Sequence, residues 1–137
     1  MKIGVTILAA GSSKRMGNQN KLLLLVNNKP ILYILCKSVL KADINQVVLV
    51  TGYQKKKIEN VLPNGIDTIV HNDHWKKGMM SSIHVGISNL QHDIDANMII
   101  LGDMPLIKTS TINSIICAFK NNKGKYLSLI HILRAHE

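Results

Sequence analysis

A glycine- and serine-rich stretch, LAAGSSKRMGNQNK at residues 8–21, follows an apolar run and carries three cationic side chains. Gly11 and the two serines after it would let successive backbone N–H groups point at one anion, and Arg15 and Lys21 would add positive charge. Neither standard phosphate-loop pattern fits, because Gly11 and Gly17 are followed by neither Gly-Lys-Ser nor the G-x-G-x-x-G spacing. The stretch therefore predicts either an anion site of another kind or a solvated turn.

Asp103 is the second candidate for chemistry, since it directly follows the strand-like segment MIILG. A carboxylate at that position would emerge at the carboxyl end of a strand. Mg²⁺ commonly takes one or two protein carboxylates together with substrate phosphates. By itself, Asp103 is more typical of a turn or a helix cap than of a metal ligand. Because the chain has only 8 Asp and Glu, few other residues compete for a metal-binding role.

A third candidate segment contains Gly78, two methionines and two serines just before a region with helical spacing. Ser81 or Ser82 could cap that helix or turn a hydroxyl toward a ligand. We expect capping for one of the two serines. Met79 and Met80 could lie in the core or form a flexible wall of a pocket, and we expect them to lie in the core.

Histidines and cysteines show no arrangement that predicts a metal or a nucleophile. His71 and His74 are three residues apart, but no cysteine and no second pair accompanies them, so we do not expect zinc. Cys36 and Cys117 each lie in an apolar segment with helical spacing. We expect both to be buried, reduced thiols.

These candidates need elements that bring them together, and the pattern of apolar residues predicts such elements. Continuous apolar runs, which are typical of strands buried on both faces, occupy residues 2–10, 45–52, 65–70 and 96–102. Segments with helical spacing occupy residues 30–42, 54–62, 80–91 and 109–120. This alternation predicts an α/β fold with a doubly wound, mostly parallel sheet.

In such a sheet, ligands bind beyond the carboxyl ends of the strands. The segments that follow the expected strands are residues 10–17, 51–53, 71–82 and 102–105. We therefore expect these four loops to converge on one crevice.

Composition narrows the classes of function. The chain has 137 residues, enough for one domain, and its net charge of +9 favours anionic partners. Its basic residues are scattered and only 4% of residues are aromatic, so we expect no nucleic-acid partner. No apolar run is long enough to span a bilayer, and we expect no secretory signal. We expect a soluble, cytoplasmic protein without a membrane partner.

Five motifs, in this order, resemble the nucleotidyltransferases of molybdenum cofactor biosynthesis: LAAGSSKRMGNQNKLLL, KPIL, VVLVTGY, HNDHWKKGMMSSIHVGI and LGDMP. The similarity is greatest to the molybdopterin cytidylyltransferases and extends from about residue 3 to about residue 120. It implies a Rossmann-like sheet of the nucleotide-diphospho-sugar transferase type that is incomplete at the C-terminus.

The resemblance also implies roles for individual residues. Arg15 and Lys21 would neutralise a triphosphate, and Asp103 would hold Mg²⁺, which makes these three the catalytic residues. The nucleotide-binding residues would be Leu8, Ala9, Ala10, Gly11, Ser12, Ser13, Asn72, Gly78 and Ser82. The guanylyl branch of the family has a glycine where this chain has Ala10, which favours CTP over GTP.

The implied reaction is Mg²⁺-dependent transfer of CMP from CTP, or of the corresponding group from another NTP, to the phosphate of molybdopterin, with release of pyrophosphate. A molybdenum hydroxylase would be the client enzyme. Two alternatives stay open: transfer to another phosphate acceptor such as a sugar phosphate, and a non-catalytic nucleotide-binding fragment.

The end of the chain departs from that family. We expect the nucleotidyltransferase domain to cover residues 1–125, as its N-terminal portion only. Residues 126–137 match nothing in the family at that position and resemble translated adapter sequence. We therefore expect a chain truncated at its C-terminus.

Overall fold

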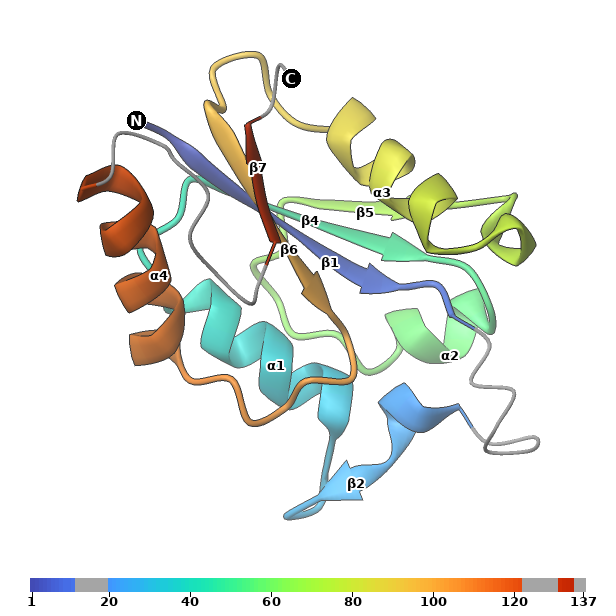
Figure 1. Ribbon diagram of the computed structural model, residues 1–137. Coiled ribbons are helices and arrows are strands. Elements are labelled where there is room, and N and C mark those ends of the chain that lie inside the picture. Colours follow the sequence, from blue (N-terminus) through green and yellow to red (C-terminus); the bar gives the residue numbers. More distant parts are fainter. Residues whose placement is uncertain (12–19, 122–130, 135–137) are drawn as a thin grey trace.

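A five-stranded sheet forms the centre of the computed structural model, which describes residues 1–11 and 20–121 and the backbone of residues 131–134. Its strands lie in the order β5-β4-β1-β6-β7 (Figure 1). Four of them are parallel, and β7 pairs antiparallel with β6. The bounds are β1 (Ile3–Ala9), β4 (Gln46–Thr51), β5 (Thr68–His71), β6 (Ala96–Leu101) and β7 (His131–Arg134).

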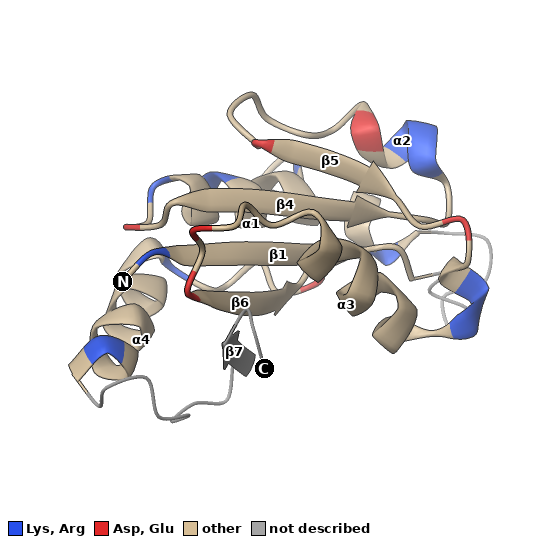
Figure 2. Ribbon diagram, turned by 90° about the horizontal axis from the view of Figure 1, so that it is seen from above, with Lys and Arg blue, Asp and Glu red and all other residues tan. Residues whose placement is uncertain are grey.

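Helices cover both faces of the sheet. The α-helices are α1 (Ile31–Leu40), α2 (Lys55–Glu59), α3 (Met79–Ser88) and α4 (Thr109–Asn121). Figure 2 shows α3 on one side of the strands and α1 on the other. The larger apolar core joins the sheet to α1, α2 and α4, whereas a smaller core lies under α3. The predicted doubly wound α/β fold is therefore confirmed.

Three short elements complete the described structure. The 3₁₀-helices are η2 (Lys21–Leu23) and η3 (Trp75–Lys77), and a hairpin is formed by β2 (Leu25–Val26) and β3 (Lys29–Pro30). Figure 1 shows this hairpin projecting from the body of the molecule. The hairpin turn uses Asn27 and Asn28, both with positive φ, which asparagine tolerates better than most residues.

The apolar run of β1 is continuous because both faces of this strand are buried. Ile3, Val5 and Ile7 pack into the larger core, while the residues between them face α3. On that second face Thr6 is small enough for α3 to approach closely at Gly86. A Cβ on Gly86 would lie 2.4 Å from the Thr6 Cγ2. The helix therefore rests directly on the strand at this point.

The order of the strands creates a crevice. From β1 the chain moves outward through β4 to β5, and then returns to place β6 on the other side of β1. The connections that leave β1 and enter β6 consequently run on opposite faces of the sheet. Crevices at such points, beyond the carboxyl ends of the strands, are the usual ligand sites of doubly wound folds.

Two expectations from the sequence were wrong in detail. The strand expected at 65–70 begins at Thr68 and forms a sheet edge, so Ile69 is 45% exposed rather than buried on both faces. Cys117 is exposed, because α4 buries only the stripe that contains Ile112, Ile116 and Phe119. Cys36 is free and buried as expected.

The expectation that Met79 and Met80 belong to the core was also wrong. They are 55% and 63% exposed in the first turn of α3, a turn in which Ser82 is the buried residue. Met79 instead lines the crevice.

Within the described residues, none of the helices combines the length and the apolar character that crossing a membrane requires.

Replacement of Gly86 by Ala tests the contact between α3 and β1. The added methyl would overlap Thr6, so we expect a loss of about 1–3 kcal/mol in the free energy of unfolding, measured by urea denaturation. Helix propensity alone predicts the opposite sign, a gain of about 1 kcal/mol. Ser88→Ala, at an exposed position of the same helix, is the control. An unchanged or more stable Gly86→Ala protein would contradict the close approach.

The two cysteines should differ in reactivity. Burial raises the pKa of the Cys36 thiol to about 12, so this thiol stays protonated and shielded at pH 8. Cys117 is exposed. Iodoacetamide under native conditions should therefore label Cys117 and leave Cys36 unmodified, as measured by peptide mass spectrometry, and both should react in urea. Equal labelling of the two in the native protein would show that the core around Cys36 is open.

Candidate functional site

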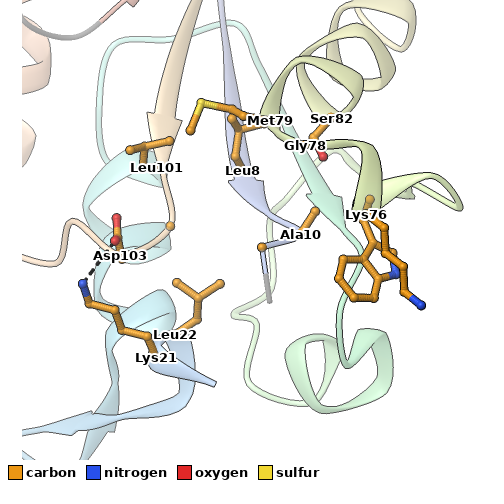
Figure 3. Close-up of a pocket in the computed structure, with 13 residues that line it drawn as sticks. Leu8, Ala10, Lys21, Leu22, Lys76, Gly78, Met79, Ser82, Leu101 and Asp103 are labelled. Atoms are coloured by element: carbon orange, nitrogen blue, oxygen red, sulfur yellow. Dashed lines mark hydrogen bonds and ion pairs between the residues drawn. The ribbon is translucent and has the colours of Figure 1, made fainter. Parts of the chain in front are cut away.

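A cleft of about 750 Å³ lies at the carboxyl ends of β1 and β6 (Figure 3). Its volume is in the range of small-molecule sites. Seven of the residues that the sequence singled out line it: Leu8, Ala10, Gly11, Lys21, Gly78, Ser82 and Asp103. They come from four segments of the chain, so the fold brings together residues that are up to 95 positions apart, from Leu8 to Asp103.

Gly102 joins the two strands that form the floor of the cleft. Its N–H donates to the Leu8 carbonyl at 2.9 Å. A Cβ on Gly102 would lie 2.8 Å from the same carbonyl oxygen, closer than real Cβ atoms come. Because the next residue is Asp103, this contact sets where the carboxylate leaves the end of β6.

The loop that follows β4 is attached to the end of β1 in a similar way. The Tyr53 N–H donates to the Ala10 carbonyl at 3.1 Å. The Tyr53 ring lies 5.5 Å from the Trp75 ring, at an interplanar angle of 54°. Trp75 and Lys76 form the wall on this side of the cleft, and the Lys76 Nζ lies 5.6 Å from the Trp75 ring centroid.

The opposite wall contains the ion pair of the cleft. The Lys21 Nζ lies 3.4 Å from the Asp103 Oδ2, and Figure 3 shows the two side chains pointing toward each other. Lys21 is held in place because Asn20 caps η2, accepting the Leu22 N–H at 3.1 Å, and because Leu22 packs into the larger core. Both charged side chains remain partly exposed, so the pair is expected to contribute at most about 1 kcal/mol to stability.

The third wall is the start of α3, which is tied to the end of β5 by Asn72. The Asn72 Nδ2 donates to the Ser81 Oγ at 2.9 Å and to the Ser82 Oγ at 3.0 Å. The Asn72 Oδ1 accepts the His74 N–H at 2.9 Å. Neither serine caps α3 in the usual way, since its N-cap position is Gly78 and no side chain caps it.

The remaining candidates lie elsewhere. Ala9 is buried in the larger core and does not line the cleft. Asn72 is 2% exposed and reaches the cleft only through Ser82. Ser12, Ser13 and Arg15 lie outside the described residues.

Six residues that line the cleft were not among the individual candidates, although four of them lie in loops that were expected to form the crevice. The six are Leu22, Trp75, Lys76, Met79, Leu101 and Gly102. Gly102 was detectable, because a glycine stands between the strand and Asp103. Leu101 was not detectable, because it reaches the cleft through the register of β1 and β6, which places it opposite Leu8 at the end of both strands.

Among the described residues that line the cleft, Asp103 is the one with a carboxylate side chain. No group of three or more His, Cys, Asp or Glu side chains that could hold a metal occurs in residues 1–11 and 20–121. His71 instead has its Nδ1 3.2 Å from the Thr51 Oγ1 and its Nε2 3.5 Å from Asp73. The arrangement suits a cation that takes most of its ligands from a substrate and water, and it does not suit structural zinc.

Two curated relatives resemble this chain in sequence. A Thermococcus sibiricus protein named "Probable molybdenum cofactor guanylyltransferase" is 34% identical over 140 residues, which cover 94% of this chain and 66% of the relative. A Lachnoclostridium phytofermentans 2-C-methyl-D-erythritol 4-phosphate cytidylyltransferase is 30% identical over 129 residues, which cover 90% of this chain and 54% of the relative. The chain therefore spans only part of the length of both proteins.

Solved structures confirm the fold. The Mycobacterium tuberculosis protein Rv0371c superposes with a TM-score of 0.75 at 24% identity, over 86% of this chain and 60% of that one. The same protein has been crystallised with manganese.

The model of the MobA-like NTP transferase domain matches residues 5–131, which include most of β1, all of β6 and every described residue that lines the cleft. The chain belongs to the family of MobA-like NTP transferase domains.

Proposed function

We propose that this chain transfers a nucleotidyl group from a nucleoside triphosphate to the phosphate of an acceptor and, more specifically, CMP from CTP to molybdopterin. One observation carries the proposal: Lys21 and Asp103 lie side by side on one wall of the cleft that opens beside the end of β1. The proposal assigns this cation to phosphate oxygens of the nucleotide and this carboxylate to a divalent metal.

Lys21 is suited to the triphosphate. As a point charge on a flexible stem, it can leave Asp103 and follow phosphate oxygens without a change in the backbone. Lys76 adds a second positive charge on the opposite side of the cleft. Arg15 is proposed to contribute a third from the glycine-rich loop.

Asp103 is proposed to hold Mg²⁺. A single partly exposed carboxylate fits an ion that also binds substrate phosphates and water. When bound, Mg²⁺ would neutralise charge on the phosphates. The manganese complex of Rv0371c is consistent with a divalent cation on this fold.

The reaction needs no covalent intermediate with the protein. An oxygen of the acceptor phosphate attacks the α-phosphorus of CTP and forms a new P–O bond. The bond from the α-phosphorus to the oxygen that bridges it to the β-phosphorus breaks, and pyrophosphate leaves with that electron pair. Lys21 would stabilise the charge that develops on the leaving pyrophosphate, so catalysis rests on positioning and electrostatics.

The choice of CTP rests on Ala10, whose side chain adds a methyl group to the wall of the cleft. One relative named above is a guanylyltransferase and the other a cytidylyltransferase. The second relative also supports an alternative acceptor, a phosphorylated polyol or sugar in place of molybdopterin. These possibilities share the cleft and differ in the ligand that occupies it.

Lys21→Ala and Asp103→Asn should separate activity from stability. Each should lower kcat/KM for pyrophosphate release by about 10²–10³-fold, the size expected for loss of a preorganised charge. Each should change the free energy of unfolding by less than about 1 kcal/mol, because the pair is partly exposed. Lys37→Ala, which removes an exposed cation on α1, is the control and should leave both values unchanged. Undiminished turnover by Lys21→Ala would refute the assignment of the cleft.

Nucleotide and acceptor selectivity can be measured together. With Mg²⁺ present, CTP, GTP, UTP and ATP are titrated separately into the full chain, and pyrophosphate release is then followed with molybdopterin or with 2-C-methyl-D-erythritol 4-phosphate. We expect turnover with CTP and molybdopterin. Preference for GTP would refute the role of Ala10, and turnover only with the second acceptor would refute molybdopterin. Nucleotide binding without any turnover would identify a non-catalytic nucleotide-binding domain.

A further inference from the structure

Asn72 occupies a position where the orientation of its amide group is determined by its neighbours. The Oδ1 lies 2.9 Å from the backbone nitrogen of His74, a group that can only donate. The Nδ2 must therefore be the atom that faces α3. The side chain is 2% exposed, so solvent does not compete for these contacts.

Both protons of that Nδ2 are used. One is donated to the Ser81 Oγ and the other to the Ser82 Oγ. Each serine hydroxyl is thus an acceptor toward Asn72, and its own proton must point elsewhere. Ser81 donates its proton to the Gly78 carbonyl at 2.7 Å, with the His74 carbonyl at 3.1 Å as a second acceptor. Ser81 is therefore satisfied within the protein.

Ser82 differs from Ser81 in one respect. It receives the Asn72 proton, but no acceptor in the described part of the chain takes the proton of its own hydroxyl. Ser82 lines the cleft (Figure 3). Since the side toward Asn72 is occupied by a donor, the Ser82 O–H is directed away from Asn72.

We propose that Asn72 is a positioning residue that makes Ser82 a hydrogen-bond donor toward the cleft, so that the ligand must present an acceptor there. This inference rests on the proposed function, in which that acceptor is an oxygen or ring nitrogen of the nucleoside part of CTP. Asn72 then acts through Ser82, whereas the family resemblance implied that Asn72 itself binds the nucleotide.

Reversal of this hydrogen-bond direction is the sharpest test. In Asn72→Asp the side chain keeps its shape and still accepts from His74, but its second oxygen can only accept. The Ser82 proton would then turn toward residue 72 and leave an acceptor facing the cleft. The His74 N–H, the two serine hydroxyls and the N-terminus of α3 would all stabilise a negative charge on the aspartate. Its carboxylate should therefore be ionised at neutral pH, and the reversal should hold there.

The experiment measures CTP affinity with Mg²⁺ by calorimetry and KM and kcat by pyrophosphate release. Ser82→Ala and Asn72→Asp should each weaken CTP binding roughly 10-fold, the effect of losing one hydrogen bond to the ligand. KM should rise accordingly while kcat changes less than about 2-fold, because neither side chain touches the reacting phosphorus. Ser81→Ala is the matched control: it removes the other partner of Asn72 and should leave CTP affinity unchanged.

The double variant Asn72→Asp/Ser82→Ala separates positioning from charge. If Asn72 acts through Ser82, the CTP affinity of the double variant should be no lower than that of the single variant with the lower affinity. Additive losses would overturn the inference, because the Asp charge would then act on the ligand directly. Equal losses in Ser81→Ala and Ser82→Ala would also overturn it, since the network would be structural only. A wild-type chain that binds none of the four nucleotides would overturn the proposed function itself, and this inference with it.

Discussion

The contact between the ends of β1 and β6 is the constraint on which the candidate site depends. The Gly102 N–H meets the Leu8 carbonyl at a distance that leaves no room for a side chain on residue 102. The two strands therefore end side by side, and the chain turns at Asp103 with its carboxylate beside Lys21. A larger residue at position 102 would move the carboxylate and the floor of the cleft together.

The fold could be predicted from the sequence because its strands are buried on both faces and separated by helical segments. The runs at β1, β4 and β6 contain almost no exposed residue, so their pattern was unambiguous. The edge strand β5 was placed with wrong bounds because local composition does not reveal which strand lacks a neighbour. Met79, Met80 and Cys117 were misplaced for a related reason: apolar character does not show which side of a helix faces the sheet.

The site was predictable in part. The sequence predicted a crevice formed by the loops that follow the strands, at the carboxyl ends of the sheet. Seven of the candidate residues line one cleft there. Asn72 shows the limit of that reasoning, because its side chain is occupied by partners that are close only after folding. Residues that act through others leave no pattern in a single sequence, whereas the geometry of a donor and its acceptors reveals them directly.

The position of Trp75 in the wall of the cleft has a practical consequence for measuring ligand binding. It is the sole tryptophan of the chain, it lines the cleft, and it lies against the Tyr53 ring and the Lys76 ammonium group. The intrinsic tryptophan fluorescence of the protein therefore originates at the cleft, without the background of distant indoles. Occupancy of the cleft can be followed optically on the unlabelled chain.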